Sequence, residues 1–98
     1  MRLEPFDATD PAERVADRFR KGVAELASAI FKDEDCRDLS SVEQVQSFMA
    51  GVATGLIGVC FAHVENAGRD AMMEAILDYL PQAREQAEGI MEDAALQN

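Results

Sequence analysis

The sequence predicts an all-α protein built as an antiparallel three-helix bundle, and three observations support this fold class. Apolar residues recur at spacings of three and four along three long segments, and no segment shows the strict alternation of a strand. Helix-capping signals precede two of these segments, and a short Asn-Ala-Gly turn separates the last two. The 98 residues suit a single domain. We therefore expect an N-terminal arm over residues 1–9 and helices over 10–31, 40–66 and 69–93.

The first helix is expected to begin after Asp10. Aspartate can accept hydrogen bonds from the first-turn amides, Pro11 suits the first helical position, and Glu13 completes a capping-box pattern. The segment that follows places charged residues on one side and apolar residues on the other, namely Val15, Phe19, Val23, Leu26, Ala27 and Ile30. This pattern predicts an amphipathic surface helix that ends near Phe31, followed by a polar linker over residues 32–39.

The central helix is the segment around which the others should pack. Residues 44–64 contain no charged side chain in a chain that is 29% charged, and Ser40 with Glu43 forms a second capping-box pattern. Bulky side chains occupy one face of this helix. The other face is small and consists of Ser47, Gly51, Thr54, Gly55, Gly58 and Ala62. Because each glycine costs up to about 1 kcal/mol of helix propensity, we expect this small face to contact another helix closely, within one chain or between two.

A membrane span is the alternative interpretation of this segment, because its length approaches the roughly 20 residues that a bilayer requires. Polar side chains interrupt the apolar run, and no Lys or Arg flanks it. Acidic residues bracket it at Glu43 and Glu65. We therefore expect a helix that is covered by protein and no membrane partner.

The third helix is expected to follow a turn at Asn66 and Gly68, since both residues tolerate the left-handed conformation that often closes a helix. Pro81 lies inside it and removes one backbone hydrogen bond. The apolar pattern nevertheless keeps its phase across the proline. The sequence therefore predicts a kinked but continuous third helix that packs antiparallel to the central one.

The charge of the chain limits its partners. A net charge of −10 argues against direct binding to nucleic acid or to an anionic membrane surface, and it favours a neutral or basic partner. Six carboxylates of the third helix share one face and form an acidic stripe, which consists of Asp70, Glu74, Asp78, Glu85, Glu88 and Glu92. This stripe is either a solvated face that keeps the protein soluble or a surface for a basic partner.

The sequence contains no catalytic, phosphate-binding or cofactor motif, so we expect no enzyme activity and no cofactor. Cys60 and His63 are spaced as two metal ligands on one helical face, but a zinc site needs about four. Two cysteines, Cys36 and Cys60, are too few for a disulfide framework, and the N-terminus has no apolar signal core. These observations favour a cytoplasmic protein without a bound metal.

The function expected from these features is that of a non-enzymatic, acidic helical module for protein–protein interaction. We expect a homodimer formed by the second and third helices, with the acidic stripe in solvent, because the central helix needs neighbours on both faces and the first and third helices offer only one apolar stripe each. One alternative is a small acidic inhibitor that mimics nucleic acid in the basic site of a nucleic-acid-binding protein. Another is a helical metal-binding protein.

Overall fold

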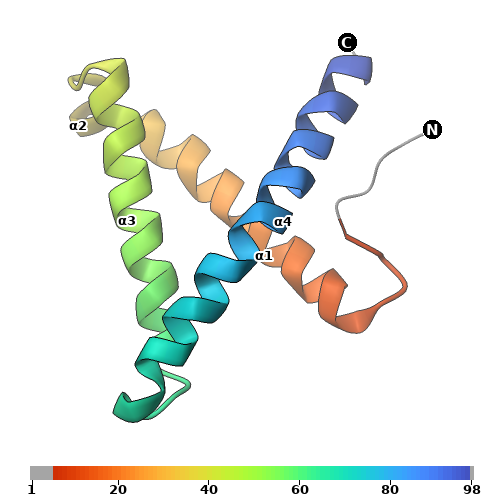
Figure 1. Ribbon diagram of the computed structural model, residues 1–98. Coiled ribbons are helices and arrows are strands. Elements are labelled where there is room, and N and C mark those ends of the chain that lie inside the picture. The colour runs from red at the N-terminus through yellow and green to blue at the C-terminus, as the bar shows by residue number, and fades with distance from the viewer. Residues whose placement is uncertain (1–5, 98) are drawn as a thin grey trace.

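The computed structural model describes residues 6–97 of the chain, with side chains as far as Glu92, and it consists of helices joined by short loops (Figure 1). The elements are α1 (Pro11–Phe31), α2 (Glu34–Arg37), α3 (Ser41–Phe61), the 3-10 helix η1 (Asn66–Gly68) and α4 (Arg69–Gln97). No strand occurs between residues 6 and 97, which confirms the all-α class. Residues 1–5 of the expected N-terminal arm lie outside the described residues.

α1 and α3 begin at the expected residues, but the expected capping box forms only at α3, because at α1 the amide of Asp10 donates to the carbonyl of Asp7 at 3.2 Å. The carboxylate of Asp10 accepts a hydrogen bond from the amide of Ala12 at 3.0 Å. At α3 the capping box is complete, since the amide of Glu43 donates to Ser40 Oγ at 3.2 Å and the amide of Ser40 donates to Glu43 Oε1 at 3.0 Å. The backbone bond from Ser40, aided by its hydroxyl, lowers the pKa of Glu43. The cap is therefore intact at neutral pH and weakens as the carboxylate is protonated in acid.

The end of α3 differs from the sequence-based expectation. The helix ends at Phe61, before the expected end at Asn66, and its last turn tightens into bonds three residues apart, such as Val64 N donating to Phe61 O at 3.2 Å. The amide of Gly68 then closes η1 on the carbonyl of Glu65 at 2.8 Å. No described residue adopts a left-handed conformation, so the expected left-handed closure is wrong. Tighter bonds satisfy the terminal carbonyls instead.

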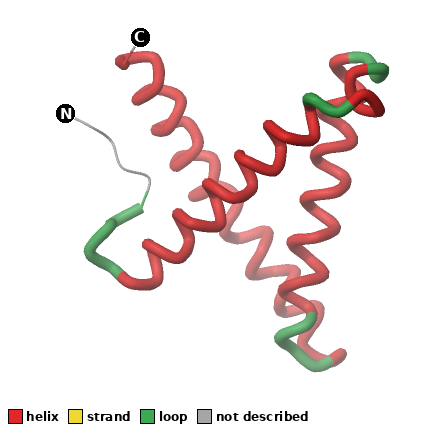
Figure 2. Tube along the Cα trace, turned by 180° about the vertical axis from the view of Figure 1, so that it is seen from behind, coloured by secondary structure: helices red, strands yellow, loops and turns green. Residues whose placement is uncertain are grey.

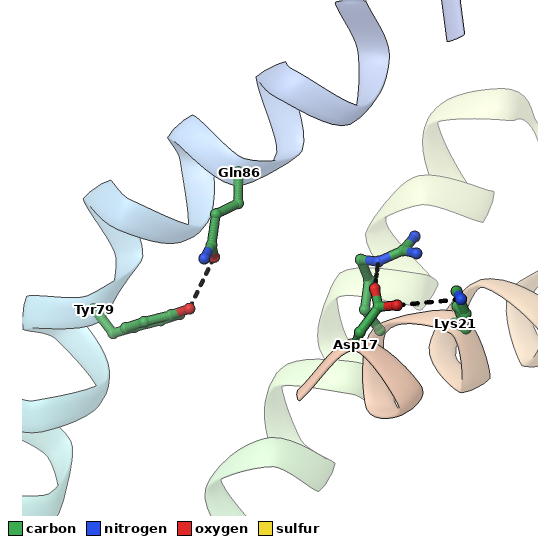
Figure 3. Close-up of polar contacts among 5 residues, drawn as sticks. Asp17, Lys21, Tyr79 and Gln86 are labelled. Carbon is green, nitrogen blue, oxygen red and sulfur yellow. Dashed lines mark hydrogen bonds and ion pairs between the residues drawn. The ribbon is translucent and has the colours of Figure 1, made fainter. Parts of the chain in front are cut away.

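The third expected helix is continuous across its proline. α4 includes Pro81 without interruption. This confirms the continuous helix that was predicted because the apolar pattern keeps its phase across the proline. A side-chain hydrogen bond spans the same turns, because the hydroxyl of Tyr79 donates to Gln86 Oε1 at 2.8 Å (Figure 3). This bond ties the turn before the proline to the turn after it, where one backbone bond is lost.

The helices do not close into a bundle within one chain. α3 and α4 meet at η1 and then diverge, while α1 crosses α4 in projection and reaches the N-terminal end of α3 (Figure 1). Figure 2 shows the same open arrangement from behind. At the junction of α1 and α3, the rings of Phe31 and Phe48 lie 5.9 Å apart. Cys36 is the one apolar residue that is buried among the described residues. The expected closed antiparallel bundle is therefore not formed by a single chain.

The dimensions of the chain agree with this open arrangement. Its radius of gyration is 15.7 Å, whereas a compact domain of this length has about 12.6 Å. Its accessible surface is 7966 Å², whereas a compact monomer of 10.7 kDa exposes about 5,500 Å². The difference of about 2,500 Å² is surface that a compact fold would bury.

Candidate protein interaction surface

The apolar stripe of α1 faces away from its own chain. We define this α1 stripe as Val15, Phe19, Val23, Leu26 and Ile30. Its side chains are all exposed, with Phe19 at 73% of its free surface. The half-buried positions are Glu13, Ala16, Asp17, Arg20 and Ala27, which are centred about a quarter turn away from the stripe. α1 therefore turns small and polar residues toward its own chain and leaves its apolar face uncovered.

The polar side of α1 carries its own ion pairs. Asp17 Oδ1 accepts from Arg20 Nε at 2.9 Å, and Asp17 Oδ2 lies 3.1 Å from Lys21 Nζ (Figure 3). The hydrogen bond from Arg20, followed by that from Lys21, lowers the pKa of Asp17. Such partly exposed pairs within one helix contribute little to stability. Arg14 and Arg18, also on α1, form no ion pair with any described residue.

The two faces of α3 are also open. On the bulky face, Met49 and Val59 are 59% and 64% exposed. On the small face, a Cβ atom added at Gly51, Gly55 or Gly58 would meet nothing within 4 Å. The small face thus contacts no helix of its own chain, and a close contact there remains a prediction for two chains. In the described part of the chain, α3 is also the one helix that is long and apolar enough to cross a membrane.

The outer side of α4 carries the acidic stripe, and all six of its carboxylates are exposed. One described ion pair involves the stripe, between Arg84 Nε and Glu88 Oε1 at 3.2 Å. Exposed apolar side chains lie beside the stripe, with Leu77 at 57% and Leu80 at 50%. α4 thus presents an apolar band and an acidic band side by side.

Two shallow clefts lie along this apolar band. The first has a volume of about 250 Å³, lies between α3 and α4, and is lined by Leu56, Ala75, Ile76, Tyr79 and Leu80. The second lies on α4 around its proline and is lined by Leu77, Leu80, Pro81, Arg84, Glu85 and Glu88. Leu80 lines both clefts. The first cleft is apolar throughout, while the second has charged residues along one edge.

His63 and the backbone of Cys36 take part in structural hydrogen bonds. His63 Nδ1 lies 2.9 Å from the carbonyl of Val59, so the ring satisfies an acceptor near the end of α3. Gln44 Nε2 donates to the carbonyl of Cys36 at 2.9 Å and fixes α2, a short helix within the expected linker. No group of three or more His, Cys, Asp or Glu side chains is arranged for a metal among the described residues.

The structure places the predicted site residues on separate surfaces. The small face lies on α3 and its C-cap Ala62, the acidic stripe lies on α4, and no described hydrogen bond or ion pair joins them. Sequence reasoning missed the exposure of the α1 stripe, because its 3–4 spacing predicts an apolar face without saying what covers it. No family model, curated protein or solved structure matches the chain.

Proposed function

We propose that the chain is a non-enzymatic interaction module whose helices complete a hydrophobic core only against another protein chain, first of all a second copy. The supporting observation is the exposure of 15 large apolar or aromatic side chains, all at 37% or more. Single exposed apolar residues are common, but apolar side chains exposed in rows along several helices indicate an interaction site. In this proposal the three-helix packing expected from the sequence is completed between chains.

The amount of uncovered surface supports an obligate partner. A standard protein interface buries about 800 Å² on each partner, and obligate homodimers bury about 1,000–2,500 Å². The surplus surface of one chain, about 2,500 Å² relative to a compact monomer, lies at the upper end of the obligate range. Burial of this surplus surface would favour association of the chain at cellular concentrations.

A protein partner accounts for the exposed surface better than a bilayer does. Lipid around α3 would cover only one of the three exposed helices and would leave the α1 stripe and the apolar band of α4 in water. The capping box at the start of α3 also places Glu43 at the end of the apolar segment, where a membrane span would be expected to carry basic residues. The proposal keeps the cytoplasmic location expected from the sequence.

The acidic stripe supports one alternative function, that of an inhibitor which occupies the basic site of a nucleic-acid-binding protein. Its six carboxylates are exposed along α4, and only Glu88 is paired with a basic side chain among the described residues. Such an inhibitor would bind its basic partner in competition with nucleic acid, and salt would weaken the complex strongly. Self-association in the absence of any basic partner would favour the interaction module instead.

The proposed function predicts that folding depends on protein concentration. When folding and dimerisation are coupled, mass action stabilises the dimer by about 2.7 kcal/mol for about a hundredfold rise in concentration. We therefore expect the melting temperature, measured by circular dichroism, to rise with concentration. A cooperative transition with a constant melting temperature would show that the chain folds alone and would contradict the proposal.

A further inference from the structure

We infer that the face formed by α3 and α4 is covered by the α1 stripe of a second copy, so that two chains exchange their α1 helices in a two-fold symmetric dimer. This inference rests on the proposed function and names the element that supplies the missing cover. It differs from the dimer expected from the sequence, in which two copies meet through their second and third helices. Three observations support it.

The first observation is that one chain exposes both the α1 stripe and an apolar cleft between α3 and α4. The α1 stripe points away from its own chain, with Phe19 and Leu26 at 73% and 57% exposure. The cleft between α3 and α4 is apolar and is lined by residues of these two helices alone. An amphipathic helix whose apolar side chains repeat every three to four residues is the usual occupant of such a cleft.

The second observation is charge complementarity. α1 carries four basic and three acidic residues, whereas α4 carries seven acidic and two basic residues. Pairing α4 with its own copy would bring two acidic helices together, but pairing α1 with α4 brings unlike charges together. Arg18, which flanks the α1 stripe and has no ion pair among the described residues, would then face the edge of the second cleft, where Glu85 and Glu88 lie.

The third observation is the shape and area of the chain. Its extents are 44 × 40 × 20 Å, so a single chain is a flat frame about two helices thick. In a dimer with two-fold symmetry the α1 contact occurs twice, because each chain places its α1 on the other chain. Neither α1 stripe is then left uncovered. The two contacts together would cover apolar surface on all three long helices, and the surplus of about 2,500 Å² per chain exceeds the roughly 800 Å² that a standard interface needs on each partner.

The test is cross-linking between chains that carry different tags, in a Cys36→Ala, Cys60→Ala background. One chain carries Gly22→Cys, beside the α1 stripe, where an added Cβ meets nothing within 4 Å. The other carries Arg84→Cys, at the edge of the second cleft. A short bismaleimide should join the two chains into a mixed dimer on a denaturing gel. The matched control is Ser28→Cys, on the opposite side of α1, which should give no mixed dimer.

A second measurement covers the case in which these cysteine variants fold poorly. Phe19→Ala removes a side chain that is already exposed in the single chain, so it should leave helix content unchanged at concentrations where the dimer persists. If the ring is a central anchor of the exchanged dimer, the dissociation constant should rise by at least about 30-fold, whereas Ser28→Ala should not change it.

The outcomes separate the inference from the proposed function. A stable dimer that gives no Gly22–Arg84 cross-link and tolerates Phe19→Ala would overturn the helix exchange and leave the interaction module standing. A single chain with both cysteines that cross-links only to itself would show that α1 closes on its own chain, which also overturns the exchange. A chain that never dimerises would overturn both.

Discussion

Leu80→Ala should weaken association of the chain by about 2–5 kcal/mol, the usual effect of truncating a leucine that is buried in a core. Leu80 lines both clefts and is 50% exposed in the single chain. In an isolated chain its removal would change little, because half of the side chain is already in water. Urea unfolding at one fixed protein concentration measures the effect.

Val42→Ala is the matched control for this prediction. Val42 is 65% exposed and lies in the first turn of α3, away from both clefts. Its truncation should change the free energy of unfolding by less than about 0.5 kcal/mol, as surface substitutions usually do. Equal losses for Leu80→Ala and Val42→Ala would show that the clefts are not a specific contact.

Gly55→Leu should destabilise the associated protein by about 1–3 kcal/mol, because a bulky side chain would overpack the small face of α3 against a second chain. The sign of this effect is informative. A Cβ atom at Gly55 meets nothing within 4 Å in the single chain, so a face that stays in solvent would instead gain up to about 1 kcal/mol from the better helix propensity. Thermal unfolding of the variant distinguishes the two results.

Gly89→Ala is the control for the glycine prediction. Gly89 lies on α4, and an added Cβ atom there also meets nothing within 4 Å. This substitution should therefore stabilise the protein through helix propensity alone. If Gly55→Leu and Gly89→Ala both raise the melting temperature, the small face of α3 is open to solvent in the assembled protein.

The features that could be predicted from the sequence are those that depend on neighbouring residues. The capping box of Ser40 and Glu43 forms as expected because both of its hydrogen bonds lie within one turn. The passage of α4 through Pro81 followed from the phase of the apolar residues on either side. The acidic stripe is exposed on one helix because the helical period alone sets which side chains share a face.

The features that could not be predicted depend on tertiary contacts. A 3–4 spacing shows that a helix needs an apolar cover, but it does not say whether that cover belongs to the same chain. For this reason the α1 stripe was expected in a closed bundle, whereas Phe19 is largely exposed in the single chain. α2 could not be predicted because four residues are too few to show a helical period. Its position also depends on the hydrogen bond from Gln44 to the carbonyl of Cys36, which is a tertiary contact.

The most direct test of the central claim, that the fold is completed by a second copy, is sedimentation equilibrium of the intact chain at micromolar concentration. Completion by a second copy predicts a mass of twice 10.7 kDa. Only dilution should dissociate this dimer, and the separated chains should no longer unfold cooperatively. A mass of 10.7 kDa at every concentration, together with a cooperative unfolding transition, would contradict it. If the chain has the monomer mass and also floats with lipid vesicles, the exposed apolar surface belongs to a membrane contact.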